Sequence, residues 1–179
     1  TAYEIMPSLV GSEMCIRDRN MGFVDRLSGA RLFTELVLIF MEEDPLPIIE
    51  RMEEFGLLRI LHPRLSLTAS LKGLLRRVGE VIHWYDLLFL EGKYEKWMVY
   101  FLAMADPLKE KEVRELSERL ALSPGQRKRL LEGRRAALRI MGTLGEMTQR
   151  PIEVYRLLSP LEDEVLLYMM AKAPKTVSY

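Results

Sequence analysis

The sequence predicts an all-α protein, built as an irregular array of about eight antiparallel helices joined by short loops. Three observations predict this class. Capping residues precede prolines at four places, apolar residues recur at spacings of three and four, and no stretch alternates with period two for long enough to form a strand. The chain has 179 residues, of which 49% are hydrophobic and 29% charged. That composition is sufficient for one or two folded domains with a core.

Four dipeptides mark helix starts, because a capping side chain stands before a proline at the first helical position, where the missing N–H costs nothing. They are Asp44-Pro45, Asp106-Pro107, Ser123-Pro124 and Ser159-Pro160. Gln126 and Glu162 follow the two serines by three residues, which is the spacing of a capping box. The expected helices are 29–42, 45–55, 67–91, 95–105, 107–122, 124–144, 149–158 and 160–173. Gly56 is expected to end the second helix, followed by a short turn to residue 61.

Charge and composition exclude several classes of protein. The 26 lysines and arginines balance 26 acidic residues, so no overall field attracts nucleic acid or a membrane to the whole molecule. The longest uncharged apolar run, residues 36–41, is far shorter than the roughly 20 residues that span a bilayer. No contact with a membrane is therefore expected.

Residues 1–19 are predicted not to belong to the natural protein. Their sequence, TAYEIMPSLVGSEMCIRDR, is similar to a translated sequencing-library adapter. The codons of one adapter end read Thr1 to Ile5, and those of the other end read Ser8 to Arg19. This segment contains Cys15, the single cysteine, so thiol nucleophiles and thiolate metal sites are excluded from the remainder. An adapter joined to coding sequence also implies a gene fragment that lacks its true start.

The sequence contains no recognisable catalytic or metal-binding motif. Two-metal nucleotidyl transfer needs closely spaced carboxylates that hold Mg²⁺, usually an Asp-x-Asp pair on a strand, and none is present. Glu162 and Glu164 are two residues apart, which places them roughly 200° apart around a helix. We expect Glu162 to cap its helix and Glu164 to face solvent. His62 and His83 have no second ligand at metal-binding spacing and are expected to be structural.

The strongest charge cluster lies in residues 126–139, which carry six basic residues and one acidic residue. At 100° per residue, Lys128, Arg135 and Arg139 fall on one helical stripe. Such a stripe suits contacts with phosphates, which give affinity without reading bases. The expected RNA-binding residues are Arg127, Lys128, Arg134, Arg135 and Arg139. The alternative is a solvated face paired to the acidic helix before it, residues 109–119.

Four aromatic residues recur at helical spacing in residues 85–100. They are Tyr85, Tyr94, Trp97 and Tyr100. Such side chains can stack on bases, but their spacing favours burial in the core.

Three consecutive elements resemble the bacterial tRNA nucleotidyltransferase and poly(A) polymerase family. They are residues 26–36 (RLSGARLFTEL), 44–47 (DPLP) and 55–63 (FGLLRILHP). In that family an Arg-x-Ser-Gly-x-Arg-x-x-x-Glu-Leu element opens the neck and body after the catalytic head. A helix ending near Phe-Gly-x-Leu and a segment ending in proline follow. Ala30 stands where a charged residue is frequent in the family. The resemblance is close over residues 25–63 and general beyond them.

The resemblance implies a parent enzyme that adds CMP or AMP, from CTP or ATP, to a tRNA 3′ end in the cytoplasm. Mg²⁺ would be held by carboxylates of a catalytic head that precedes this sequence, so the fragment alone is expected to be inactive and to hold no cofactor. The implied neck element comprises Arg26, Ser28, Arg31 and Glu35. Of these, the two arginines and the glutamate would brace the helix turn beneath the nucleotide pocket. The expected partners are the acceptor region of tRNA and the missing head in cis.

These interpretations divide the chain into a non-native segment, residues 1–19, a neck-like helical region, 20–63, and a helical body with part of a tail, 64–179. A second interpretation is a free-standing helical protein-interaction module, whose basic face is only solvated.

Overall fold

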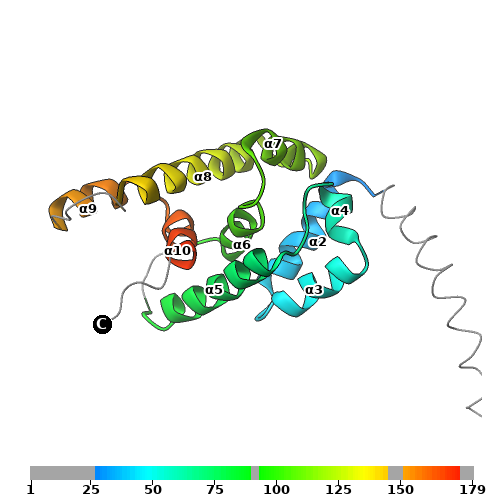
Figure 1. Ribbon diagram of the computed structural model, residues 1–179, viewed down its shortest axis with the longest axis horizontal. Helices are drawn as coiled ribbons and strands as arrows, with labels where there is room; N and C mark the ends of the chain where they lie inside the picture. Colours follow the sequence, from blue (N-terminus) through cyan, green and yellow to red (C-terminus); the bar gives the residue numbers. More distant parts are fainter. Residues whose placement is uncertain (1–26, 90–92, 145–150, 174–179) are drawn as a thin grey trace, which may run out of the picture.

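All regular secondary structure in the described residues, 27–89, 93–144 and 151–173, is helical in this computed structural model (Figure 1). The helices are α2 (Gly29–Met41), α3 (Leu46–Glu54), α4 (Leu57–Leu61), α5 (Ala69–Asp86), α6 (Lys96–Met104), α7 (Glu110–Arg119), α8 (Pro124–Leu144), α9 (Pro151–Leu158) and α10 (Asp163–Lys172). The all-α prediction is confirmed. Residues 57–61, predicted as a turn, form the short helix α4 because Gly56 adopts a left-handed conformation, with φ 70°, that restarts the chain as a helix.

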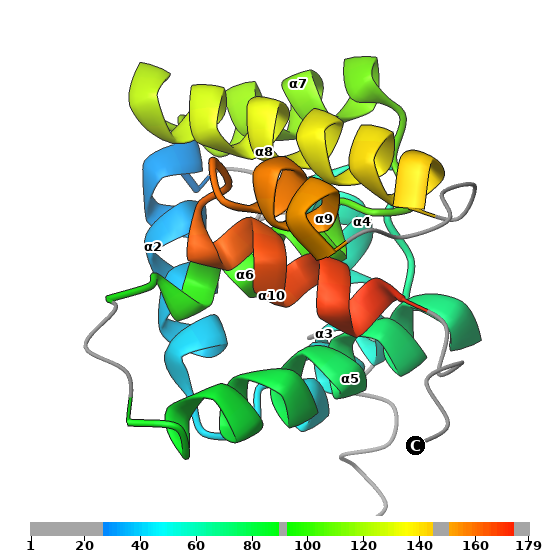
Figure 2. The ribbon, with the colours of Figure 1, turned by 90° about the vertical axis from the view of Figure 1, so that its left-hand side faces the viewer.

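Helix α6 is the centre of the fold. Every residue from Trp97 to Met104 is buried, and a helix that is apolar on all sides has to be covered on all sides. Helices α2, α5, α8 and α10 supply that cover. Figure 2 shows α7 and α8 above α6 and α10, with α5 below them. No helix in the described part of the chain is long and apolar enough to cross a membrane.

Aromatic side chains join α2 to α6 in the core. The rings of Phe40 and Tyr100 stack with their centroids 5.7 Å apart, and Phe33 meets Trp97 edge to face at 5.4 Å. Tyr85 and Tyr94 also pack edge to face, 5.3 Å apart, at the partly buried margin of the core. The expectation that these aromatic residues pack within the protein is therefore confirmed.

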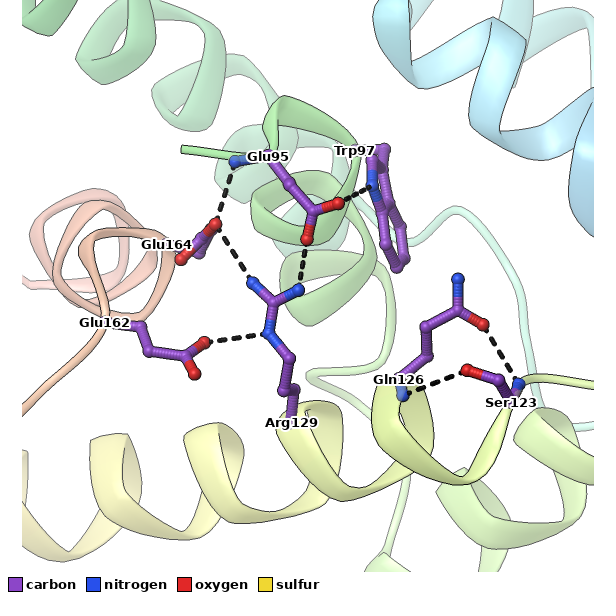
Figure 3. A network of polar contacts seen from close by, with 7 residues as sticks. All are labelled: Glu95, Trp97, Ser123, Gln126, Arg129, Glu162 and Glu164. Atoms are coloured by element: carbon purple, nitrogen blue, oxygen red, sulfur yellow. Dashed lines mark hydrogen bonds and ion pairs between the residues drawn. The ribbon is translucent and has the colours of Figure 1, made fainter. Parts of the chain in front are cut away.

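Two of the four predicted helix starts are observed. Ser123 and Gln126 form the predicted capping box, because each side chain accepts a hydrogen bond from the other residue's backbone N–H, at 3.3 and 3.0 Å (Figure 3). At the start of α3, the Asp44 carboxylate accepts a hydrogen bond from the Leu46 N–H at 3.2 Å. Both contacts involve residues close in sequence, which is why the sequence predicts them.

The other two predicted starts are wrong. The helix expected at Pro107 begins at Glu110, and the helix expected at Pro160 begins at Asp163. The Asp106 carboxylate instead accepts hydrogen bonds from Lys172 and, at 2.5 Å, from the Tyr168 hydroxyl. Asp106 therefore binds a helix distant in sequence rather than capping its own.

Candidate nucleic-acid interface

The start of α2 carries the residues that the sequence predicts as a neck element. The Ser28 hydroxyl caps this helix by accepting a hydrogen bond from the Arg31 N–H at 3.3 Å. The side chains of Arg31 and Glu35 are exposed, and no ion pair joins them to each other or to another described residue. Arg26 lies outside the described residues. The structure therefore gives Ser28 a local role and leaves the faces of Arg31 and Glu35 open to solvent.

The glycine of the same element lies in a close contact between two helices. A Cβ atom at Gly29 would lie 1.9 Å from the carbonyl oxygen of Arg119 and 3.2 Å from the Ala121 nitrogen. Helix α7 ends at this point, and Ala121 turns the chain with φ 52°. Only glycine allows the first turn of α2 to approach this backbone so closely. The element thus joins α2 to the turn that begins α8.

Helix α8 carries the predicted basic residues, and the structure divides them into three groups. Lys128 and Arg139 are exposed and form no ion pair with any described residue. Arg127 and Arg135 are paired with carboxylates of α7. Arg134 is buried, with 9% of its surface exposed. The five predicted RNA-binding residues are therefore not equivalent: two cations are open, two are paired and one faces inward.

The two paired arginines contact opposite ends of α7. Arg135 forms a bidentate ion pair with Glu110, in which its Nε lies 2.8 Å from Oε2 and its Nη2 contacts Oε1. Arg127 Nη1 lies 3.4 Å from Glu118 Oε1. These contacts are the acidic-helix pairing that the alternative interpretation describes. They apply to Arg127 and Arg135 only.

Glu110 is the most strongly perturbed carboxylate of this surface. Hydrogen bonds from Arg135 and then from Arg114 lower the pKa of Glu110 from 4.5 to about 2. The same pairing with Glu110 raises the pKa of Arg135. Both groups are thus charged at neutral pH, and the basic stripe is partly neutralised at its middle.

Arg134 stabilises the connection between α6 and α7. Its Nη2 donates to the carbonyl oxygens of Asp106, at 3.3 Å, and of Leu108. Beside it, burial and then the hydrogen bond to Asp106 raise the pKa of the Tyr168 hydroxyl. This guanidinium donates its hydrogen bonds to backbone carbonyls and lies below the surface.

Arg129, which the sequence did not single out, joins three helices. Its guanidinium binds the carboxylates of Glu95, of Glu162 at 3.0 Å and of Glu164 at 3.1 Å (Figure 3). The Glu164 side chain is only 6% exposed and also accepts a hydrogen bond from the Glu95 N–H at 2.8 Å. The network ties the start of α6 and the start of α10 to α8.

The expectations for Glu162 and Glu164 are both wrong. Glu162 stands at the N-cap position of α10, φ −67° and ψ 149°, but its carboxylate binds Arg129 and makes no capping hydrogen bond. The helical angle of roughly 200° between the two residues does not apply to a residue outside the helix. Both carboxylates can therefore reach the same guanidinium.

A cavity of about 910 Å³ lies between the α3–α4 turn and α7. His62 is buried at its wall, with Nδ1 accepting the Arg64 N–H at 3.2 Å and Nε2 lying 3.3 Å from Glu115 Oε2. No group of three or more possible metal ligands occurs in the described ranges.

Comparison with known proteins identifies relatives of the chain. Residues 19–67 match a family described as "Probable RNA and SrmB- binding site of polymerase A". An A-adding tRNA nucleotidyltransferase of Geobacter sulfurreducens is 40% identical over 157 residues, which cover 85% of this chain and 18% of that protein. The chain thus spans less than a fifth of the length of this relative.

Solved structures show the same fold. A Thermotoga maritima CCA-adding enzyme complexed with tRNA matches 91% of this chain with 39% of its own, at TM-score 0.70 and 21% identity. A CCA-adding enzyme with CTP matches 93% of this chain with 39% of its own, at TM-score 0.71 and 20% identity. A tRNA-processing enzyme matches 89% of this chain with 43% of its own, at TM-score 0.73 and 22% identity.

The shared fold defines an all-α segment of the kind found in tRNA-processing enzymes. These similarities support a fragment of the tRNA nucleotidyltransferase family, as the resemblance of residues 26–36 predicts. The matched residues 19–67 include α2, α3 and α4.

Proposed function

We propose that this chain is the tRNA-binding helical part of a CCA- or A-adding enzyme that processes tRNA 3′ ends. The observation that carries the proposal is the 40% identity to an A-adding tRNA nucleotidyltransferase over 85% of the chain. The match of residues 19–67 to a family described by RNA binding supports it. In this proposal residues 1–19 are not part of the natural protein, and residues 20–63 and 64–179 form the neck-like region and the body.

The proposed phosphate contacts are those of the open cations of α8. Lys128 and Arg139 are eleven residues apart, so they lie about 16 Å apart along the helix and only about 20° apart around it. Both are exposed. Two cations on one line suit two phosphates of one RNA backbone, and they give binding that depends on salt rather than on base sequence.

The parent enzyme would add CMP or AMP to the acceptor end of tRNA in the cytoplasm, with Mg²⁺ and CTP or ATP bound by its catalytic head. Arg31 and Glu35 are proposed to support that head, because they are exposed on α2 beside the capped start of the helix. No residue of this chain is assigned a catalytic role. Its own contribution is to hold the tRNA and to support the neck.

Titration of a tRNA transcript against the chain across a salt series tests the proposal. Each phosphate contact contributes about 0.7 to 0.9 to the slope of log K against log[salt]. The double variant Lys128→Gln, Arg139→Gln should therefore reduce the magnitude of that slope by about 1.4 to 1.8.

A matched control removes the same charge elsewhere. Arg76 on α5 and Lys111 on α7 are exposed, and the variant Arg76→Gln, Lys111→Gln should leave the slope close to that of the unaltered chain. An unchanged slope in the Lys128, Arg139 variant would contradict the proposal. It would favour the alternative interaction module, in which the α8 face is only solvated.

A further inference from the structure

The middle of the basic line on α8 is covered by a carboxylate. Arg135 lies on the line between Lys128 and Arg139, and it is held by Glu110 of α7 in the bidentate ion pair. We propose that Glu110 limits the affinity of this surface for RNA, because a backbone phosphate has to replace it on Arg135. This inference rests on the proposed function, and it makes Glu110 the residue that regulates RNA binding.

The geometry of the pair allows this exchange. A planar guanidinium binds a carboxylate and a phosphate with the same two-pronged arrangement of N–H groups. The side chains of Arg135 and Glu110 are 52% and 43% exposed, so a phosphate can approach the outer side of the guanidinium. Ion pairs with this exposure are weak and are further weakened by salt.

Glu110 does not lose all its partners when Arg135 moves to RNA. Its Oε1 also accepts from Arg114 Nη2 at 2.9 Å, four residues further along α7. The carboxylate therefore stays paired after the exchange, and no uncompensated charge remains at the surface. This second partner makes Glu110 a replaceable ligand of Arg135 rather than a fixed one.

Two other arginines of α8, Arg129 and Arg134, differ from Arg135 in this respect. Arg134 is buried and donates to backbone carbonyls, which have no comparable alternative donor. Arg129 binds three carboxylates, one of which, that of Glu164, is almost fully buried. A phosphate cannot replace either set without opening the core. Arg135 is the only residue paired with a described carboxylate among the three on this line, Lys128, Arg135 and Arg139, and its transfer from Glu110 to RNA gives a row of three cations that contact phosphates.

Binding of a tRNA transcript to Glu110→Gln tests the inference. The substitution keeps the size of the side chain and removes its charge. We expect binding about two- to fivefold tighter than that of the unaltered chain at low salt, because an exposed ion pair of ordinary strength no longer competes. The magnitude of the salt slope should rise by up to about 0.7 to 0.9, because Arg135 then contacts a phosphate in every complex rather than only in those in which Glu110 has been replaced.

Three variants separate this effect from a change in net charge or fold. Glu115→Gln removes one charge from the same helix but contacts His62 and Lys111, and it should leave the salt slope unchanged. Glu110→Asp keeps the charge but shortens the reach to Arg135, and it should give an intermediate affinity. In an Arg135→Gln background, Glu110→Gln should have no effect on the slope.

The outcomes also separate this inference from the proposed function. An unchanged affinity and slope in Glu110→Gln, with the expected loss in the Lys128, Arg139 variant, overturns the inference and leaves tRNA binding in place. Absence of salt-dependent tRNA binding by the unaltered chain overturns both. A gain of slope that persists without Arg135 overturns the assignment of Glu110 to that arginine.

Discussion

Gly29 lies so close to the carbonyl oxygen of Arg119 that a Cβ atom at residue 29 would be 1.9 Å from it. The contact joins residues ninety positions apart in sequence, at the point where α2 begins and α7 ends. It gives a physical reason for the glycine within the Arg-x-Ser-Gly element.

Gly29→Ala should destabilise the chain by about 3 kcal/mol, because the added carbon forces two backbone segments apart. For a chain of this size we expect the midpoint of thermal unfolding to fall by roughly 6 to 12 °C. Gly125→Ala is the matched control, since a Cβ at residue 125 meets nothing within 4 Å. Equal stability of the two variants would show that α2 does not approach α7 as described.

Arg134→Met should lower the free energy of unfolding by about 1 to 3 kcal/mol, because the carbonyls of Asp106 and Leu108 lose a buried donor. The salt slope for tRNA should not change, since this guanidinium is not at the surface. Arg139→Met should show the reverse. Its free energy of unfolding should stay within about 0.5 kcal/mol of that of the unaltered chain, and its salt slope for tRNA should be smaller in magnitude. Urea unfolding and tRNA titration of both variants decide between a structural and an RNA-binding role.

The stability of the chain should depend on Glu110 at acidic pH. The pKa of Glu110 is lowered in the folded chain to about 2 from 4.5, so its contribution is fully present above pH 4.5 and is lost as the pH falls toward 2. Unfolding experiments should therefore find that the unaltered chain and Glu110→Gln differ at pH 7 and converge near pH 2. A difference that stays constant over this range would contradict the pairing.

Arg129→Met should destabilise the chain by about 2 to 4 kcal/mol, because it leaves the buried Glu164 beside two other carboxylates. Glu164→Gln added to this variant should restore part of the loss, since it removes the buried charge. Lys128→Met, one residue away and exposed, should change the free energy of unfolding by less than about 0.5 kcal/mol. Chemical denaturation of the unaltered chain, Arg129→Met, Glu164→Gln and the double variant, compared as a cycle, measures the coupling between Arg129 and Glu164.

In the complete enzyme, Arg31→Ala and Glu35→Ala should each reduce nucleotide addition more than tRNA binding, because both residues face away from the helical body. Their effects on stability should be small and additive, since no ion pair joins them. Steady-state kinetics and tRNA titration of the single and double variants test this. Full activity of both single variants would remove these residues from the proposed support of the head.

The sequence predicts local features of this fold better than long-range ones. The capping box of Ser123 and Gln126 uses residues three apart, and its geometry follows from a single helical turn. Asp106 has the same local signal before a proline, but Tyr168 and Lys172 compete for its carboxylate from another helix. Sequence spacing contains no information about such a competitor, and for this reason the prediction at Asp106 is wrong.

The difference between local and long-range contacts also explains which residues of the basic surface the sequence predicts correctly. Helical periodicity places Lys128, Arg135 and Arg139 on one stripe, and these three side chains reach the surface. Arg134 immediately precedes Arg135 on the helix, but whether it faces solvent depends on where α6 ends and α7 begins. The ion pairs of Arg129 with three carboxylates require Glu162 to lie outside α10. The sequence places the start of that helix at Pro160, and it therefore does not predict these ion pairs.

The central position of α6 has a consequence for how this protein is made. Two of the helices that cover it, α2 and α5, precede it along the chain, and the other two, α8 and α10, follow it. During synthesis, one side of this unbroken run of apolar side chains stays uncovered until α10 has left the ribosome. Such a segment is prone to aggregate. Shorter versions that stop before residue 172 should accumulate as insoluble material, whereas chains that include α10 close their core.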